Sequence, residues 1–184
     1  EPALANQIIE RAKKSIELPS ADYKPDGAYP EGYGYWNYGT SFHILFLSAL
    51  QKLSMIDHQI DDGFRKTAYY YQQMLGTSGK SFNYSDASGG TGLSPSIFWY
   101  ANMTKDNSLL YNEKKYIQDK NMVRNRILPA VMIWGNGLSL DNVPSPSKNV
   151  FVGHGKSPVA LMRTSWTDPN AIYVGFKAGS ASIN

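Results

Sequence analysis

The sequence contains no cysteine, and this excludes disulfide bonds, thiolate metal sites and a cysteine nucleophile. No apolar run comes near the roughly 20 residues that a membrane-spanning helix needs. Lysine and arginine are not clustered and the formal net charge is only +3, so we expect neither a membrane span nor a nucleic-acid partner. Hydrophobic residues make up 42% and charged residues 18%, which is typical of a folded chain rather than a disordered one.

Tyrosine, in contrast, is abundant, with 13 copies beside 7 phenylalanines and 4 tryptophans. Because glycine and proline interrupt the aromatic segment 26–38 and favour turns, we predict that its rings stand on a loop. Two interpretations stay open. The rings, together with the carboxylate of Glu31, suit a sugar site, or they form a plug that seals a core. The rings are Tyr29, Tyr33, Tyr35, Trp36 and Tyr38.

Apolar residues recur at helical spacing through most of the first 134 positions, which predicts a mainly helical region. Successive helices joined by loops of unequal length fit an α/α toroid, and a helical bundle fits the same pattern. In the second helix, His43 is expected to be a structural hydrogen-bonding residue more often than a substrate contact. The expected helices run from Pro2 to Pro19, from Thr40 or Ser41 to Ser54, from a cap at Asp57 to Leu75, from Ser94 and Pro95 to Met103, from Asn107 to Tyr116, and over 122–128.

The polar segment 76–92 is too long to be a simple connection, which favours a functional loop or disorder. Its polar candidates are Asn83, Tyr84 and Asp86. Its Gly-Gly-Thr-Gly end lacks the preceding strand and the lysine of a phosphate loop, so nucleotide binding is excluded there.

The composition changes at residues 135–148, which read as a linker rich in glycine, proline and serine. Strand patterns follow at 159–164 and 171–177, separated by a turn signal, with a shorter candidate at 150–152. Two or three strands alone cannot cover both faces of a sheet. We therefore predict an α+β multidomain fragment that is mostly α and ends inside a β domain.

Residues 25–36, Pro-Asp-Gly-Ala-Tyr-Pro-Glu-Gly-Tyr-Gly-Tyr-Trp, resemble the heparinase II/III-like polysaccharide lyases. Three segments of the strand region resemble the same family, and they follow in the family's order: residues 153–159, 163–166 and 176–179. The resemblance implies an incomplete (α/α) toroid over 1–134, the linker 135–148, and the first antiparallel strands of a β-sandwich over 149–184. It also implies a carbon–oxygen lyase that cleaves a uronic-acid-containing glycan by β-elimination in the periplasm or outside the cell.

In that family a tyrosine works at the scissile bond, and it maps best to Tyr35, four residues after Glu31. The resemblance implies that Tyr35 protonates the leaving oxygen and, in a syn elimination, also acts as the base. The family's asparagine motif would precede Glu1, and its His-x-His-x-Asp run, a zinc ligand in some members, would follow Asn184. No metal ligand or cofactor is therefore assigned within these residues, and the isolated 184-residue piece is expected to be inactive.

Further substrate-binding roles are predicted for Glu31, Tyr33, Trp36, Tyr38, Tyr84 and Arg163. Glu31 is expected to hold the loop, and Trp36 is the ring of this set that fits a core position best. Arg163 suits a uronate carboxylate, although a strand arginine more often forms a surface or interdomain ion pair. Two other functions stay open: an α/α-toroid hydrolase, which needs two carboxylates about 5 to 10 Å apart, and a non-catalytic glycan-binding module.

Overall fold

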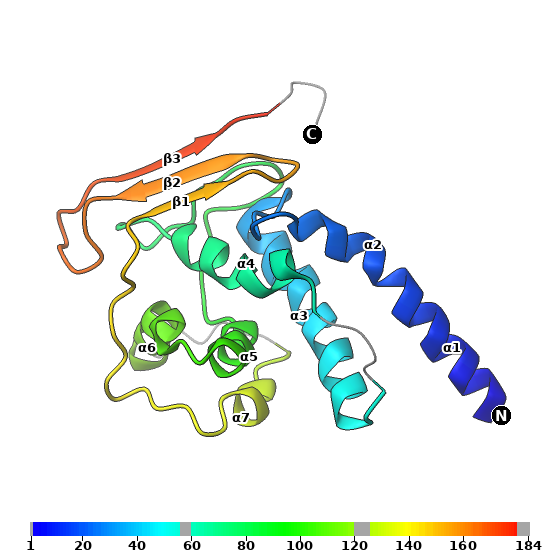
Figure 1. The fold of residues 1–184 in the computed structure, drawn as a ribbon. Coiled ribbons are helices and arrows are strands. Elements are labelled where there is room, and N and C mark those ends of the chain that lie inside the picture. Colours follow the sequence, from blue (N-terminus) through cyan, green and yellow to red (C-terminus); the bar gives the residue numbers. More distant parts are fainter. Residues whose placement is uncertain (1, 56–59, 120–125, 180–184) are drawn as a thin grey trace.

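The computed structural model describes residues 2–55, 60–119 and 126–179, which form a group of helices followed by a small antiparallel sheet (Figure 1). This confirms the mixed helical and sheet composition expected from the sequence, while the toroid and the sandwich stay predictions. The helices are α1 (Pro2–Ser15), α2 (Glu17–Ser20), α3 (Gly32–Lys52), α4 (Asp62–Gln73), α5 (Pro95–Thr104), α6 (Tyr111–Gln118) and α7 (Ala130–Trp134), with 3-10 turns at Ala21–Tyr23 and Asn107–Leu110. The strands are β1 (Val150–Gly153), β2 (Val159–Arg163) and β3 (Tyr173–Lys177).

Helix α1 projects away from the other elements, and none of its residues is buried against the described part of the chain (Figure 1). The expected end of this helix at Pro19 is wrong, because helical structure resumes in α2 and runs through Pro19 to Ser20. Proline is tolerated there because it lies in the first turn of α2, where a backbone N–H has no helical partner.

Helix α3 begins at Gly32 and not at Thr40 or Ser41, so the predicted aromatic loop is helical over its second half. Gly32 has a φ of +79°, a conformation that glycine adopts without strain at the turn into the helix. Glycine lowers helix propensity, but burial of one side of α3 outweighs this cost. Tyr33, Trp36 and Ile44 lie on that buried side.

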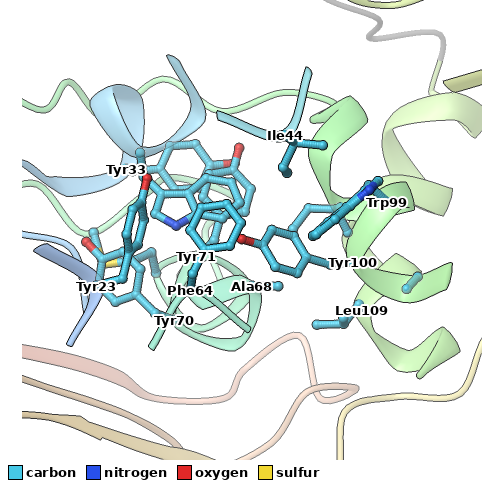
Figure 2. Packing of buried hydrophobic residues seen from close by; sticks show 14 of the residues in the cluster. Tyr23, Tyr33, Ile44, Phe64, Ala68, Tyr70, Tyr71, Trp99, Tyr100 and Leu109 are labelled. Atoms are coloured by element: carbon cyan, nitrogen blue, oxygen red, sulfur yellow. The ribbon is translucent and has the colours of Figure 1, made fainter. Parts of the chain in front are cut away.

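The aromatic core forms where α3 crosses α4 (Figure 2). Tyr71 of α4 stacks on Tyr33 at 4.2 Å between ring centroids and on Trp36 at 4.0 Å. The indole Nε1 of Trp36 donates to Thr67 Oγ1 at 2.7 Å, and that hydroxyl donates to the carbonyl of Gly27 at 2.6 Å. These contacts join both helices to the segment that precedes α3.

Helix α4 is capped by Asp61, whose carboxylate accepts the N–H of Gly63 at 2.8 Å. The cap expected at Asp57 lies outside the described residues. Helix α5 begins at Pro95 after Ser94, as predicted, although the Ser94 hydroxyl donates to Asn37 instead of capping the helix. Residues 122–125 of the helix expected over 122–128 also lie outside the described residues, and 126–129 form turns before α7.

The sheet has the order β1-β2-β3 with antiparallel neighbours, as the strand pattern predicted. Alternate side chains face the helices, and Phe151 of β1 lies 5.9 Å from Tyr70 of α4 between ring centroids. The opposite face is apolar and exposed, with Val152 50% and Phe176 62% accessible. No described helix is long and apolar enough to cross a membrane.

Candidate functional site

The outward side of α3 carries a row of exposed rings, which we call the α3 aromatic face: Tyr35, Tyr38 and Phe42. Their spacing of three and four residues places them on one side of the helix, and they are 45%, 58% and 43% exposed. Tyr38 and Phe42 pack edge to face at 5.1 Å between ring centroids. The structure therefore brings the predicted catalytic phenol of Tyr35 together with the predicted sugar contact Tyr38.

Arg126 adds a cation to this face, because its guanidinium carbon lies 5.6 Å from the centroid of the Phe42 ring. Arg126 is exposed, and no carboxylate among the described residues forms an ion pair with it. Sequence reasoning missed this residue, since nothing in the pattern around position 126 relates it to Phe42. An exposed arginine beside aromatic rings can bind a carboxylate or sulfate group.

Glu31 lies at the amino end of α3, one helical turn before Tyr35, and is exposed. It accepts a hydrogen bond from the Tyr29 hydroxyl at 3.4 Å. Burial raises the pKa of Tyr29, and the Glu31 and Asp22 carboxylates raise it further. Tyr29 therefore stays a neutral donor to Glu31, and the carboxylate charge is also favourable at the start of a helix.

Three residues predicted to contact substrate are buried instead: Tyr33 is 3%, Trp36 0% and Tyr84 7% exposed. The Tyr84 hydroxyl donates to the carbonyl of Tyr29 at 2.5 Å and lies 2.5 Å from the Tyr70 hydroxyl. The expectation that these rings line a cleft is corrected, because packing between helices occupies their surfaces. These three rings lie in the core, which for the rings of segment 26–38 was one of the two interpretations left open from the sequence. Tyr35 and Tyr38 instead face outward and are exposed.

Arg163, the predicted carboxylate contact, is 7% exposed at the junction between the sheet and α4. Its Nη2 donates to the last carbonyls of that helix region, Gln73 O at 3.2 Å and Leu75 O at 2.5 Å. The guanidinium also stacks on Trp166, with its carbon 3.4 Å from the ring centroid. A cation at a helix carboxyl end meets the negative end of the helix dipole, so Arg163 fastens the sheet to α4.

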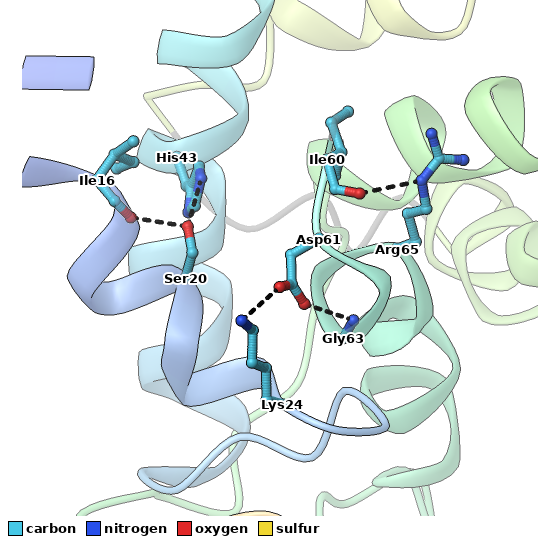
Figure 3. A network of polar contacts seen from close by, with 8 residues as sticks. All are labelled: Ile16, Ser20, Lys24, His43, Ile60, Asp61, Gly63 and Arg65. Atoms are coloured by element: carbon cyan, nitrogen blue, oxygen red, sulfur yellow. Dashed lines mark hydrogen bonds and ion pairs between the residues drawn. The ribbon is translucent and has the colours of Figure 1, made fainter. Parts of the chain in front are cut away.

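His43 lies in a small polar cavity of about 280 Å³ between α2, α3 and α4. Its Nε2 is 3.4 Å from the Ser20 hydroxyl, which itself donates to the carbonyl of Ile16 (Figure 3). Because the only proton of that hydroxyl is used, Nε2 is the donor to Ser20. Burial lowers the pKa of His43 to about 4, so the ring is neutral at physiological pH and serves as a structural hydrogen-bonding group.

A histidine–aspartate hydrogen-bond contact and an ion pair connect the turn between β1 and β2 to the segment before α3. Asp26 accepts both the backbone N–H and Nδ1 of His154, at 2.8 and 2.7 Å, and Lys156 pairs with Asp22. Gly153 packs against Ala28, which leaves no room for a side chain at that position. His154 and its partner Asp26 are 128 residues apart in the chain, and no local pattern can reveal such a contact.

The α3 aromatic face is an open surface. Cavities of about 1050, 540, 280 and 530 Å³ lie among the described residues, and Tyr35 lines none of them. The largest lies against the other half of α3, at Leu45 and Ala49. No group of three or more histidine, aspartate or glutamate side chains gathers within the described part of the chain to hold a metal ion.

No family model matches the sequence, and no curated protein matches it significantly.

Proposed function

We propose that this chain belongs to a polysaccharide lyase that cleaves a uronic-acid-containing glycan by β-elimination, with Tyr35 as the proton donor to the leaving oxygen. The observation that carries the proposal is the position of Tyr35. It lies four residues after Glu31 in the segment that resembles the heparinase II/III-like lyases, and its side chain is 45% exposed beside Tyr38. The same resemblance supports a periplasmic or extracellular location.

The reaction breaks the C5–H and C4–O4 bonds of a uronate and forms the C4–C5 double bond. A base takes the C5 proton, the electron pair becomes the double bond, and an acid protonates O4 as it leaves. A neutral phenol can supply that proton directly, whereas a phenol that acts as the base must first ionise. The charge that develops on the carboxylate side needs fixed donors or cations.

The α3 aromatic face offers suitable contacts for an acidic sugar. Tyr38 and Phe42 present ring surface for the C–H face of a pyranose, and Arg126 presents above Phe42 a guanidinium that forms no ion pair with a described carboxylate. Glu31 is in place to orient a hydroxyl group near Tyr35. The proposal needs further donors for the developing charge.

Incubation of the whole protein with uronic glycans tests this function. A lyase produces new ultraviolet absorbance from the C4–C5 double bond. We expect Tyr35→Phe to reduce turnover by about 100-fold or more, because proton transfer typically contributes that much, with glycan affinity nearly unchanged. Tyr38→Phe, which removes a hydroxyl from the same face, is the matched control and should keep most of the turnover.

Unchanged turnover in Tyr35→Phe would reject Tyr35 as the proton donor. A non-catalytic glycan-binding module is the second candidate, because the aromatic face combines exposed rings with the cation of Arg126. In that case the glycan is retained and no double bond appears. Reducing ends without new absorbance would indicate a hydrolase, for which the described face offers no second carboxylate opposite Glu31.

A further inference from the structure

A concave region that shares no residue with the α3 aromatic face lies between α6 and the turn that joins β2 to β3. We call it the α6 cleft. Its volume is about 540 Å³, which is in the range of small-ligand sites. The long polar segment 76–92 contributes part of its wall through Gly76, Thr77 and Gly79.

The floor of the α6 cleft holds a positive charge that no described carboxylate balances. Arg163 lines the cleft, and within the described residues its guanidinium contacts two carbonyl oxygens and two aromatic rings. Its Nε is buried without a hydrogen-bond partner in the described structure. Burial lowers the pKa of Arg163 to about 10, so the group remains a cation at neutral pH. A buried cation of this kind favours an anion in the adjoining cleft.

Basic side chains at the rim of the α6 cleft add to this positive charge. Lys115 is exposed and has no partner among the described residues, and Lys114 donates to a carbonyl oxygen, that of Asp141, at 3.0 Å. The one acidic side chain that lines the cleft, Asp168, accepts the N–H of Asn170 at 2.8 Å within its own turn. Three basic side chains thus face one acidic side chain, and a concave wall concentrates their field.

Two aromatic side chains, Tyr111 and Trp166, also line the α6 cleft. Trp166 donates from Nε1 to the carbonyl of Lys148 at 2.9 Å, and the Tyr111 hydroxyl donates to the carbonyl of Trp166 at 2.9 Å. Their rings meet edge to face at 5.8 Å between centroids. Because both rings are held by hydrogen bonds to backbone, they offer a pre-formed surface for a sugar ring at little entropic cost.

We propose that the α6 cleft is an accessory site for an anionic sugar unit, which it binds through a carboxylate or sulfate group near Arg163 and Lys115 and through ring contact with Trp166 and Tyr111. The inference rests on the proposed function, in that the same acidic glycan would reach both surfaces. It adds a second contact region, away from Tyr35, that would set the affinity for long acidic chains.

The experiment is a calorimetric titration of the whole protein with oligogalacturonate, which carries carboxylates, with a κ-carrageenan oligosaccharide, which carries sulfate esters, and with neutral malto-oligosaccharide. We expect Lys115→Gln to weaken binding of the anionic ligand by about threefold and Lys115→Glu by about tenfold, the scale of a single ion-pair contact. Lys14→Gln removes the same charge from the projecting helix α1 and should stay within about twofold of wild type.

The site is supported if affinity falls in the Lys115 variants and not in Lys14→Gln. The ligand whose affinity falls then identifies carboxylate or sulfate as the recognised group. Equal binding in wild type and Lys115→Glu, equal binding of the neutral sugar, or no binding of either anionic ligand would overturn it. The elimination assay on Tyr35→Phe separates the two proposals. If Tyr35→Phe loses turnover but the Lys115 variants bind the anionic ligand as tightly as wild type, only the α6 cleft proposal is rejected. If binding depends on Lys115 but no elimination is detected, only the lyase function is rejected.

Discussion

The two sides of α3 carry the same kinds of side chain in opposite surroundings. Tyr33 and Trp36 lie against Tyr71 and are almost fully buried, whereas Tyr35 and Tyr38 are about half exposed. Burial raises the pKa of Tyr33 well above the ordinary tyrosine value, so its phenol cannot exchange protons near neutral pH. The comparison shows that, within one aromatic segment, the inward rings hold the fold and the outward rings are the ones available to a ligand.

The largest expected effect is on the buried side. Trp36→Ala should lower the free energy of unfolding by about 3 to 5 kcal/mol, because it empties a closed aromatic stack and removes the bond to Thr67. Urea denaturation followed by circular dichroism measures this loss. Trp36→Phe keeps a ring in the stack and should cost clearly less. A loss below about 1 kcal/mol in Trp36→Ala would show that the buried side does not hold the helices together.

Gly27 and Gly34 should differ next in how alanine substitution changes the stability of the protein. Gly27 has a φ of +94°, and an added Cβ would lie 2.6 Å from backbone atoms of Thr67, so Gly27→Ala should cost about 2 kcal/mol or more. Gly34, on the exposed side of α3, has no atom within 4 Å of an added Cβ. Gly34→Ala should stabilise the protein by about 0.5 to 1 kcal/mol through helix propensity. Thermal unfolding of both variants tests the difference, and equal shifts would contradict it.

A buried carboxyl beside the inward rings should make stability depend on pH. Burial raises the pKa of Glu113 to about 8, although the N–H of Ser94 at 2.8 Å opposes the shift. The folded state therefore keeps this proton longer than the unfolded state. Its stabilising contribution is complete below pH 4.5 and is lost as pH rises toward 8.

Glu113→Gln removes the ionisation and keeps an oxygen acceptor for Ser94. Relative to the variant, the wild type should lose of the order of 2 kcal/mol of unfolding free energy between about pH 4.5 and 8. Denaturant titrations across this range measure the loss. Parallel curves for the two proteins would show that Glu113 does not titrate in that window.

The smallest expected effect on stability is on the outward side. Tyr35→Ala and Tyr38→Ala should each change the free energy of unfolding by less than about 1 kcal/mol, because exposed side chains lose little packing. The same denaturation assay checks this, and a loss as large as that of Trp36→Ala would end the distinction between the two sides. The function of these residues is tested separately, by turnover and affinity.

Local patterns predicted much of the fold. The apolar spacing marked α1 and α4, the Ser94–Pro95 pair marked the start of α5, and the change of period marked the strands. The start of α3 was wrong because local propensity treats glycine as a helix breaker, and it cannot include the burial gained against Tyr71. The continuation past Pro19 was missed because it depends on the turn at Ile16, after which the new helix α2 begins.

The candidate site was predictable only in part. The motif singled out Tyr35 and Glu31, but it gave no means of separating the exposed Tyr38 from the buried Tyr33 once the segment was taken as a loop. Arg126, beside Phe42, and the Asp26–His154 pair join residues far apart in the chain. Contacts of that kind arise only when the helices and the sheet have packed.

The sequence by itself determined where most of the helices and the strands lie, because side-chain spacing and proline or serine at helix starts act over a few residues. It also showed that segment 26–38 is unusually rich in aromatic residues. Only the tertiary structure decided which of those rings are accessible and that Arg163 fastens the sheet to α4. The physical reason is that burial and charge pairing depend on surfaces that distant parts of the chain supply.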